Sequence, residues 1–171
     1  GITASRSGVG VSVASRELAG ALSSFGTKTL LVDLSRVEFV DTAAPEGLAE
    51  ETTFLPLATE VLPSLFVVVL DADRQPTLTV DGLRTALSRA VQSGFTVVVD
   101  LPPVLQASGA PTPSIATAGS ACDLVFLVCL SGEMNQKEVV TCVDTGRIVG
   151  LKLGGLILND WRMPTSGLIA G

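Results

Sequence analysis

A glycine- and serine-rich stretch near the start of the chain, SRSGVGVSVAS (residues 5–15), has residue types that bind phosphate. Glycines let a backbone curl until its N–H groups converge on an anion, and a following helix adds its positive N-terminus. Gly8 and Gly10, before a predicted helix from Ser12, supply this arrangement. A phosphate loop normally continues with Lys and then Ser or Thr. Here Val11 stands at the lysine position, so the stretch is either a phosphate loop without its cation or a Gly-rich turn.

Polar residues stand at the ends of several apolar runs that predict strands. Asp33 ends TLLVD, Asp100 ends FTVVVD, and Asn159 ends LGGLILN. Open α/β sheets gather their ligands at the carboxyl ends of parallel strands, so these side chains are candidates for a site there. Each also has a plainer interpretation, because an Asp can cap a buried strand and Asn159 can be a turn residue.

The runs themselves are apolar throughout, which is typical of parallel strands covered by helices on both faces. Ile2 and Thr3 resemble the last residues of a first strand, so we expect that strand to begin before residue 1. The other predicted strands are residues 29–33, 65–71, 95–100, 124–130 and 153–159.

Amphipathic segments between these runs predict helices over Ser12–Phe25, Val80–Ser93 and Glu133–Val149. Glycines at 26 and 94 are placed to end the first two. The stretch 38–63 is irregular and predicts a loop with a short helix. Alternating strands and helices predict one α/β domain over residues 1–171, with a doubly wound, mostly parallel sheet flanked by helices. The first helix has an apolar face made by Val13, Leu18, Ala21, Leu22 and Phe25.

Composition excludes several classes of protein. A net charge of −6 argues against a nucleic-acid binder, which needs a basic face. No apolar run is long enough for a transmembrane helix. There is no histidine, and Cys122, Cys129 and Cys142 are widely spaced, so a metal cage or a disulfide framework is not indicated. Because the three cysteines lie in or beside apolar runs, we expect buried small hydrophobes in a reducing cytosol.

The order of these motifs resembles the bacterial tyrosine kinases (BY-kinases) and the related MinD/ParA group of deviant P-loop ATPases. The most specific piece is VVVDLPPVL, similar to the family's apolar run followed by Asp-x-Pro-Pro, and the resemblance covers nearly the whole chain. It implies that Gly8, Gly10 and Ser12 lie in a Walker A loop. Arg6 would take the place of the signature lysine of the MinD/ParA group, although a solvated loop charge is the plainer interpretation.

The resemblance also assigns roles to the residues at the strand ends. It implies that Asp33 is the first Asp of Walker A′, that Asp100 is the Walker B Asp, and that Asn159 binds adenine. Ser12, Asp33 and Asp100 would then hold magnesium. A second acidic stretch, LDADR, lies too far from the loop to be Walker A′, so Asp71 and Asp73 are interpreted as solvated loop acids.

The chain departs from the family pattern at several points. Walker A′ reads Asp-x-Asp-x-Arg in the family, whereas here Ser35 replaces the second carboxylate and Val37 the arginine. The Walker A lysine is also missing, and there is no tyrosine for the autophosphorylation that the family carries out. Losing a point charge from a phosphoryl-transfer site should cost several kcal/mol of transition-state stabilisation.

We therefore expect a catalytically impaired BY-kinase-like subunit that regulates or scaffolds exopolysaccharide synthesis or export. Its expected partners are an inner-membrane chain-length regulator, another assembly protein or copies of itself, and not nucleic acid. It would be cytoplasmic, at the inner face of the membrane through that partner. Binding of ATP or ADP with magnesium would be weak or lost. Two alternatives stay open: an active ATPase or tyrosine kinase with a substitute for the lysine, and a MinD/ParA-like positioning ATPase.

Overall fold

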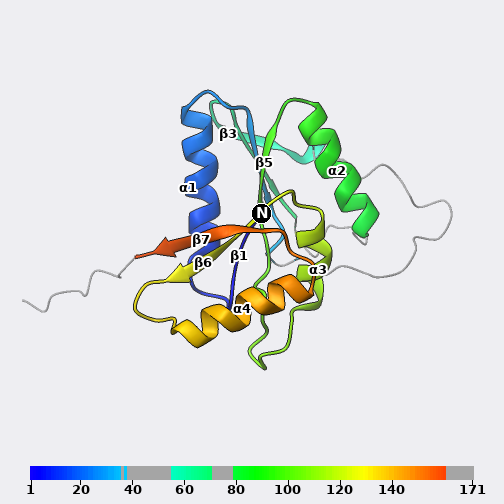
Figure 1. The fold of residues 1–171 in the computed structure, drawn as a ribbon. Coiled ribbons are helices and arrows are strands. Elements are labelled where there is room, and N and C mark those ends of the chain that lie inside the picture. Colours follow the sequence, from blue (N-terminus) through cyan, green and yellow to red (C-terminus); the bar gives the residue numbers. More distant parts are fainter. Residues whose placement is uncertain (36, 38–54, 71–78, 161–171) are drawn as a thin grey trace, which may run out of the picture.

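The computed structural model describes residues 1–35, 37, 55–70 and 79–160, which form one seven-stranded sheet with helices on both faces (Figure 1). The strands are β1 (Ile2–Ala4), β2 (Thr29–Asp33), β3 (Thr59–Leu62), β4 (Leu65–Val69), β5 (Thr96–Asp100), β6 (Val125–Leu130) and β7 (Leu153–Asn159). The helices are α1 (Val11–Ser24), α2 (Val80–Gln92), α3 (Pro113–Ser120) and α4 (Gln136–Ile148), with a short 3₁₀ turn at Leu55–Leu57.

The strand order is β3-β4-β2-β5-β1-β6-β7, and every pairing except that of β3 with β4 is parallel. This confirms the predicted doubly wound, mostly parallel α/β sheet. The strand that carries the candidate phosphate loop, β1, lies in the interior of the sheet beside β5 and β6. The loop after β1 therefore emerges at the middle of the carboxyl edge, where the ends of neighbouring strands surround it.

The two faces of the sheet are covered unequally. Helices α2, α3 and α4 cover one face, and they share the larger core cluster, which contains Leu83, Ile115 and Cys142 from the three helices. On the other face α1 packs over the sheet, and the smaller cluster there includes Ala19. Figure 1 shows α1 alone on its side of the strands.

Local signals explain where two helices begin and end. The Thr79 hydroxyl accepts a hydrogen bond from the Gly82 N–H at the start of α2, and Gly94 adopts a left-handed φ just beyond its end. Helix α4 begins at Gln136, not at Glu133 as predicted, because Asn135 and Glu138 form a capping box that sets its first turn.

Helix α1 buries a different face from the one its apolar residues predict. Val13 is 53% exposed and Phe25 is 86% exposed, and Leu18 also reaches the surface. The buried residues are instead the small Ser15, Ala19 and Ser23. Small side chains let the helix approach the sheet closely. Leu22 of the predicted face still packs against the core, whereas Val13, Leu18 and Phe25 are left exposed.

Two elements were missed by sequence reasoning. Helix α3 is short and carries few large apolar residues, so its periodicity is weak. Strand β3 falls within the stretch predicted to be irregular, and its residues are all exposed at the edge of the sheet. Strand β4 ends at Val69, two residues before the predicted end. Residues 38–54 of the irregular stretch, together with Asp71 and Asp73, lie outside the described residues.

The three cysteines are all free and buried, which confirms their interpretation as small core residues. Burial raises the pKa of each thiol, that of Cys142 to about 12. Among the helices that the structure describes, none is long and apolar enough to cross a membrane.

Candidate functional site

The candidate site is built on the loop that joins β1 to α1 at the carboxyl edge of the sheet. Gly8 and Gly10 adopt left-handed backbone conformations, with φ of 86° and 90°. Gly10 is the residue before α1, and its C=O accepts the first helical hydrogen bond from the Ala14 N–H at 2.9 Å. No side chain caps this end, and its first turn carries no acidic residue. The free N–H groups of the first turn are thus available to an anion.

Asn159 closes the loop from the far end of the chain. It is the last residue of β7, and its Nδ2 donates to the backbone oxygen of Val9 at 3.1 Å, across 150 residues of sequence. A Cβ atom added to Gly10 would collide with the same Nδ2. Glycine at position 10 is therefore required twice, once by its φ and once by the close approach of Asn159.

Val11 is the first residue of α1, and its side chain is half-buried. It packs against the core cluster between α1 and the sheet. At the position where a phosphate loop carries its lysine, the chain thus has an apolar packing contact.

Asp100 and Asp33 lie opposite each other in the parallel register of β5 and β2. Asp100 is only 3% exposed, and one of its oxygens, Oδ1, is buried without a hydrogen-bond partner. Burial raises the pKa of Asp100 to about 6; a hydrogen bond with the Ser12 hydroxyl opposes this rise, the charge of Asp33 adds to it, and Arg16 lowers it slightly. Helix α1 and two strands thus bring Ser12 and both carboxylates to one edge, as the sequence predicted.

Asp33 is held by the residue that stands in place of the second Walker A′ carboxylate. The Ser35 N–H and the Ser35 hydroxyl both donate to Asp33 Oδ1, at 3.0 and 2.6 Å. This short turn after β2 fixes the Asp33 carboxylate at the mouth of the site, where it is only partly buried.

The donor atoms at this edge fit a magnesium ion that also binds phosphate. Mg²⁺ prefers oxygen ligands and is usually held by one or two carboxylates, several waters and substrate phosphates. Ser12, Asp33 and Asp100 offer such oxygens, and the unpartnered Asp100 Oδ1 is the atom that a cation or its bound water would satisfy. Within the described residues no group of three or more His, Cys, Asp or Glu could hold a metal ion.

Arg6 lies on the same loop but binds another segment. Its guanidinium pairs with the Glu133 carboxylate at 3.4 Å, and the two side chains are 53% and 61% exposed. Glu133 belongs to the turn between β6 and α4, which sequence reasoning did not connect with the loop. Nearby, Ser5 is buried and its hydroxyl contacts the sulfur of Met134 at 3.7 Å. In this structure Arg6 is therefore a surface charge that links two loops.

The segment that follows Asp100 of β5, which begins Leu-Pro-Pro, is hydrogen-bonded to the end of β1 and the start of the loop. The sequence did not reveal this role. The Thr3 hydroxyl donates to the backbone oxygen of Pro102 at 2.6 Å. The N–H groups of Val104 and Leu105 donate to the carbonyls of Ala4 and Ser5, at 2.7 and 3.0 Å. The segment thus lies along the end of β1 and fixes where the phosphate loop starts.

Comparison with solved structures places this architecture among known folds. The kinase domain of the Escherichia coli tyrosine kinase ETK is 23% identical over 92% of this chain, with a TM-score of 0.69. The BceF tyrosine kinase domain is 26% identical over 92% of this chain, with a TM-score of 0.62. The Aquifex aeolicus cell division protein MinD is 16% identical over 94% of this chain, with a TM-score of 0.67.

The match covers only part of each relative. The chain spans 65% of the ETK domain, 66% of the BceF domain and 68% of MinD. No protein-family model matches the chain, and no curated protein matches it. The chain has the BY-kinase-like fold of the MinD/ParA group of P-loop ATPases, as its motifs predicted.

Proposed function

We propose that this protein is a catalytically impaired BY-kinase-like subunit that regulates or scaffolds exopolysaccharide synthesis or export. The observation that carries the proposal is Val11, which packs on the core at the position of the catalytic cation. The pairing of Arg6 with Glu133 supports the interpretation of Arg6 as a loop charge and not as a substitute for that cation. Ser35 stands where the family has its second Walker A′ carboxylate. Independent losses in one site support a role without rapid phosphoryl transfer.

Weak nucleotide binding is compatible with this role. The backbone N–H groups of the loop do not depend on the side chain at position 11, and Asn159 lies beside the loop. We propose that ADP or ATP binds here with Ser12, Asp33 and Asp100 holding magnesium. A bound magnesium ion would offset phosphate charge, which is part of the work that the absent lysine does in active relatives.

The proposed partner is an inner-membrane chain-length regulator or another exopolysaccharide-assembly protein, and the chain would meet it at the cytoplasmic face of the membrane. The support for this is the resemblance to BY-kinases, with two tyrosine kinase domains among the structural neighbours. The net charge of −6 supports protein contacts rather than direct binding to DNA or anionic lipid.

The test is to introduce a lysine at position 11 and to measure the affinity for nucleotide. Calorimetric titration with ATP and ADP, with and without magnesium, is compared for the native chain and Val11→Lys. We expect weak or no binding by the native chain, and an affinity for Mg-ATP at least about tenfold higher for Val11→Lys, since a charge-assisted bond is worth about 1.5–3 kcal/mol. Val13→Lys adds the same charge at an exposed position of the same helix and should leave the affinity unchanged.

Tight binding and magnesium-dependent hydrolysis of ATP by the native chain would overturn the proposal and support an active enzyme. A second arm tests the scaffold role separately, by co-purification of the native chain with the cytoplasmic segments of its candidate polysaccharide-assembly partner. If the native chain recovers no partner while the calorimetric results are as expected, the scaffold role alone is rejected.

A further inference from the structure

The peptide group between Val9 and Gly10 is held by a hydrogen bond from the last residue of β7. Asn159 Nδ2 donates to the Val9 C=O at 3.1 Å, and within the described residues no other hydrogen bond reaches that carbonyl. The Val9 side chain is 2% exposed and belongs to the core cluster between α1 and the sheet. The peptide is therefore anchored on the valine side and is followed by a glycine.

This hydrogen bond sets the direction of the N–H group in the same peptide. The described chain has no cis peptide bond, and in a trans peptide the C=O and the N–H point in opposite directions. The Gly10 N–H therefore points away from Asn159, and no hydrogen bond between described residues uses it. It joins the N–H groups of the first turn of α1, which have no acceptor within the helix.

The backbone at Gly10 offers little resistance to a rotation of this peptide. Half a turn would change the φ of Gly10 from 90° to a negative value, and glycine adopts both signs about equally readily. The rotated peptide would present the Val9 C=O, with its partial negative charge, where the N–H now points. A loop in that state would repel a phosphate group, because anion-binding loops depend on converging N–H groups.

Asn159 is itself fixed by neighbouring backbone. It lies opposite Leu130 in the register of β6 and β7, and its C=O accepts a hydrogen bond from the Ser131 N–H at 2.8 Å. The turn that follows Ser131 also contacts the loop, through the pairing of Glu133 with Arg6. The carboxyl ends of β6 and β7 thus hold the loop at two points.

We propose that Asn159 is a positioning residue for phosphate, whose amide keeps the Gly10 N–H directed at the bound anion whether or not that anion carries a base. The inference rests on the proposed binding of nucleotide phosphates at this loop. It gives Asn159 a role separate from the contact with adenine that its motif implies. An inorganic oligophosphate reports this role, because tripolyphosphate has no base and an effect of Asn159 on its binding cannot come from contact with one.

The test compares Val11→Lys alone with a double variant that also carries Asn159→Leu, because lysine at position 11 is expected to give a measurable affinity. Calorimetry measures the affinity for tripolyphosphate with magnesium. NMR follows the Val9 carbonyl carbon and the Gly10 amide in the absence of ligand. Leucine is close to asparagine in size and has no donor. Asn159→Asp, whose carboxylate also has no N–H to donate, is the second variant if leucine prevents folding.

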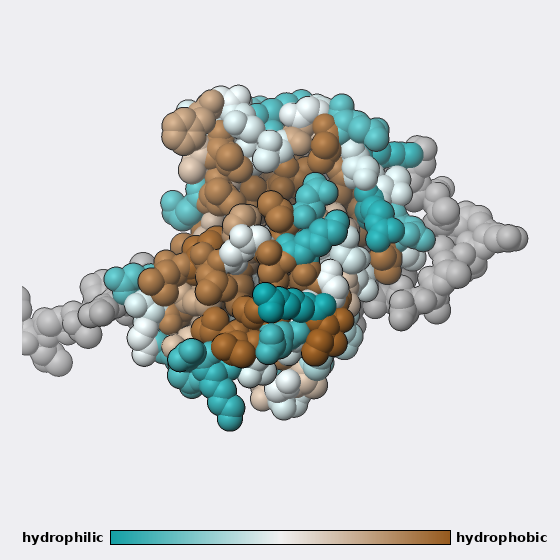
Figure 2. Space-filling model, in the orientation of Figure 1, coloured by the Kyte–Doolittle hydropathy of each residue, from teal (hydrophilic) through white to brown (hydrophobic). Residues whose placement is uncertain are grey.

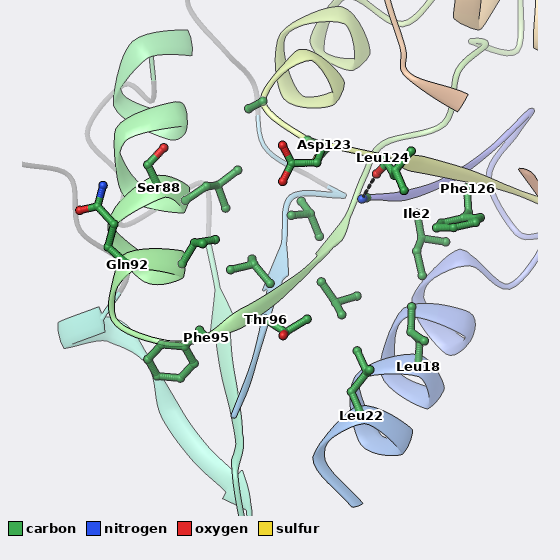
Figure 3. Close-up of a pocket in the computed structure, with 18 residues that line it drawn as sticks. Ile2, Leu18, Leu22, Ser88, Gln92, Phe95, Thr96, Asp123, Leu124 and Phe126 are labelled. Atoms are coloured by element: carbon green, nitrogen blue, oxygen red, sulfur yellow. Dashed lines mark hydrogen bonds between the residues drawn. The ribbon is translucent and has the colours of Figure 1, made fainter. Parts of the chain in front are cut away.

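The matched control removes an amide far from the loop. Figure 2 shows apolar side chains gathered between α1 and α2, and Gln92 lines the pocket between these helices (Figure 3). Gln92 is the last residue of α2 and lies at the edge of the sheet opposite the loop. Gln92→Leu in the Val11→Lys chain replaces this exposed amide by leucine and should leave both measurements unchanged.

With Asn159→Leu we expect the Val9 and Gly10 signals to shift, and the affinity for tripolyphosphate to fall by about tenfold or more, since a hydrogen bond to a charged group is lost. Unchanged Val9 and Gly10 signals would overturn the proposal. So would an equal affinity in the two chains, or no detectable tripolyphosphate binding by Val11→Lys. These outcomes leave the proposed function standing, because that function is rejected by ATP hydrolysis in the native chain.

Discussion

The two ends of β5 lie in different surroundings, one polar and one apolar. At its carboxyl end the strand has neighbours on both sides, and the Asp-Leu-Pro-Pro segment that follows bonds to the loop after β1. At its amino end one side of the strand faces an apolar pocket. The carboxyl end is therefore closed and polar, whereas the amino end is open and apolar.

This difference separates a candidate ligand site at the carboxyl end of β5 from an apolar pocket at its amino end. Glycine conformation, converging N–H groups and carboxylates at the carboxyl end suit a small anionic ligand with a cation. The amino end borders a pocket lined by apolar side chains of α1 and α2. Substitutions at the two ends of this interior strand should therefore have separable effects.

The largest effect is expected from Gly10→Ala. The substitution places a Cβ in a left-handed conformation and against Asn159 Nδ2, so it should cost about 3 kcal/mol of unfolding free energy. Gly8→Ala is the matched control, since its φ is 86° but nothing lies within 4 Å of the added Cβ. We expect the control to cost about 1–2 kcal/mol in urea denaturation. An equal loss of unfolding free energy in both variants would show that the close approach of Asn159 to Gly10 adds nothing to the cost.

Asp100 should make stability depend on pH. Its pKa rises from 3.8 to about 6 on folding through burial, so the folded chain retains a proton that the unfolded chain releases. The unfolding free energy should therefore fall as pH rises from about 4 to about 6, by about 3 kcal/mol at most, and then level off. Asp100→Asn should remove this dependence and stabilise the chain at pH 7.5.

The control for this pH profile is Asp81→Asn, which removes an exposed carboxylate on α2 that pairs with Arg84 at 3.8 Å. It should change stability by less than about 0.5 kcal/mol and leave the profile intact. An unchanged profile in Asp100→Asn would show that another group produces the dependence.

Two valines that face the same side of β5 compare its closed and open ends directly. Val99 is buried in the larger core cluster, whereas Val97 is only partly buried against it. We expect Val99→Ala to cost about 2–3 kcal/mol and Val97→Ala about 1 kcal/mol in thermal or urea unfolding. If both cost the same, the amino end of β5 is as enclosed as its carboxyl end.

The smallest effect is expected from Arg6→Ala. The ion pair with Glu133 is exposed, so its loss should change the unfolding free energy by less than about 1 kcal/mol. We expect nucleotide affinity to stay within about twofold of the native value, because the guanidinium pairs with Glu133 in this structure. A large loss of affinity or of ATP hydrolysis would instead identify Arg6 as the substitute cation of an active enzyme.

Local signals in the sequence predicted much of this fold. The runs ending in Asp33, Asp100 and Asn159 were recognisable as buried strands because nearly every residue in them is apolar. The ends of two helices followed from Gly26 and Gly94, which both adopt a left-handed φ. Helix α3 and strand β3 were missed because neither carries the periodic pattern of large apolar residues that identifies an element.

The candidate site was predictable in its residues but not in its contacts. Motif order predicted that Gly10, Ser12 and the strand-end carboxylates would meet at one edge. Arg6 pairs with Glu133, which is distant in sequence, and Val11 packs on the core between α1 and the sheet. Residue type alone does not predict such partners, because a charge or a valine is compatible with many of them.

The sequence by itself determined the fold class, the parallel sheet and the position of the phosphate-type loop, because these depend on local periodicity, glycine placement and strand-end residues. Only the tertiary structure decided which face of α1 is buried and which segment Arg6 contacts. Both depend on how closely separate segments approach. Ser15, Ala19 and Ser23 allow a contact that larger side chains would prevent, and the turn before α4 brings Glu133 to Arg6.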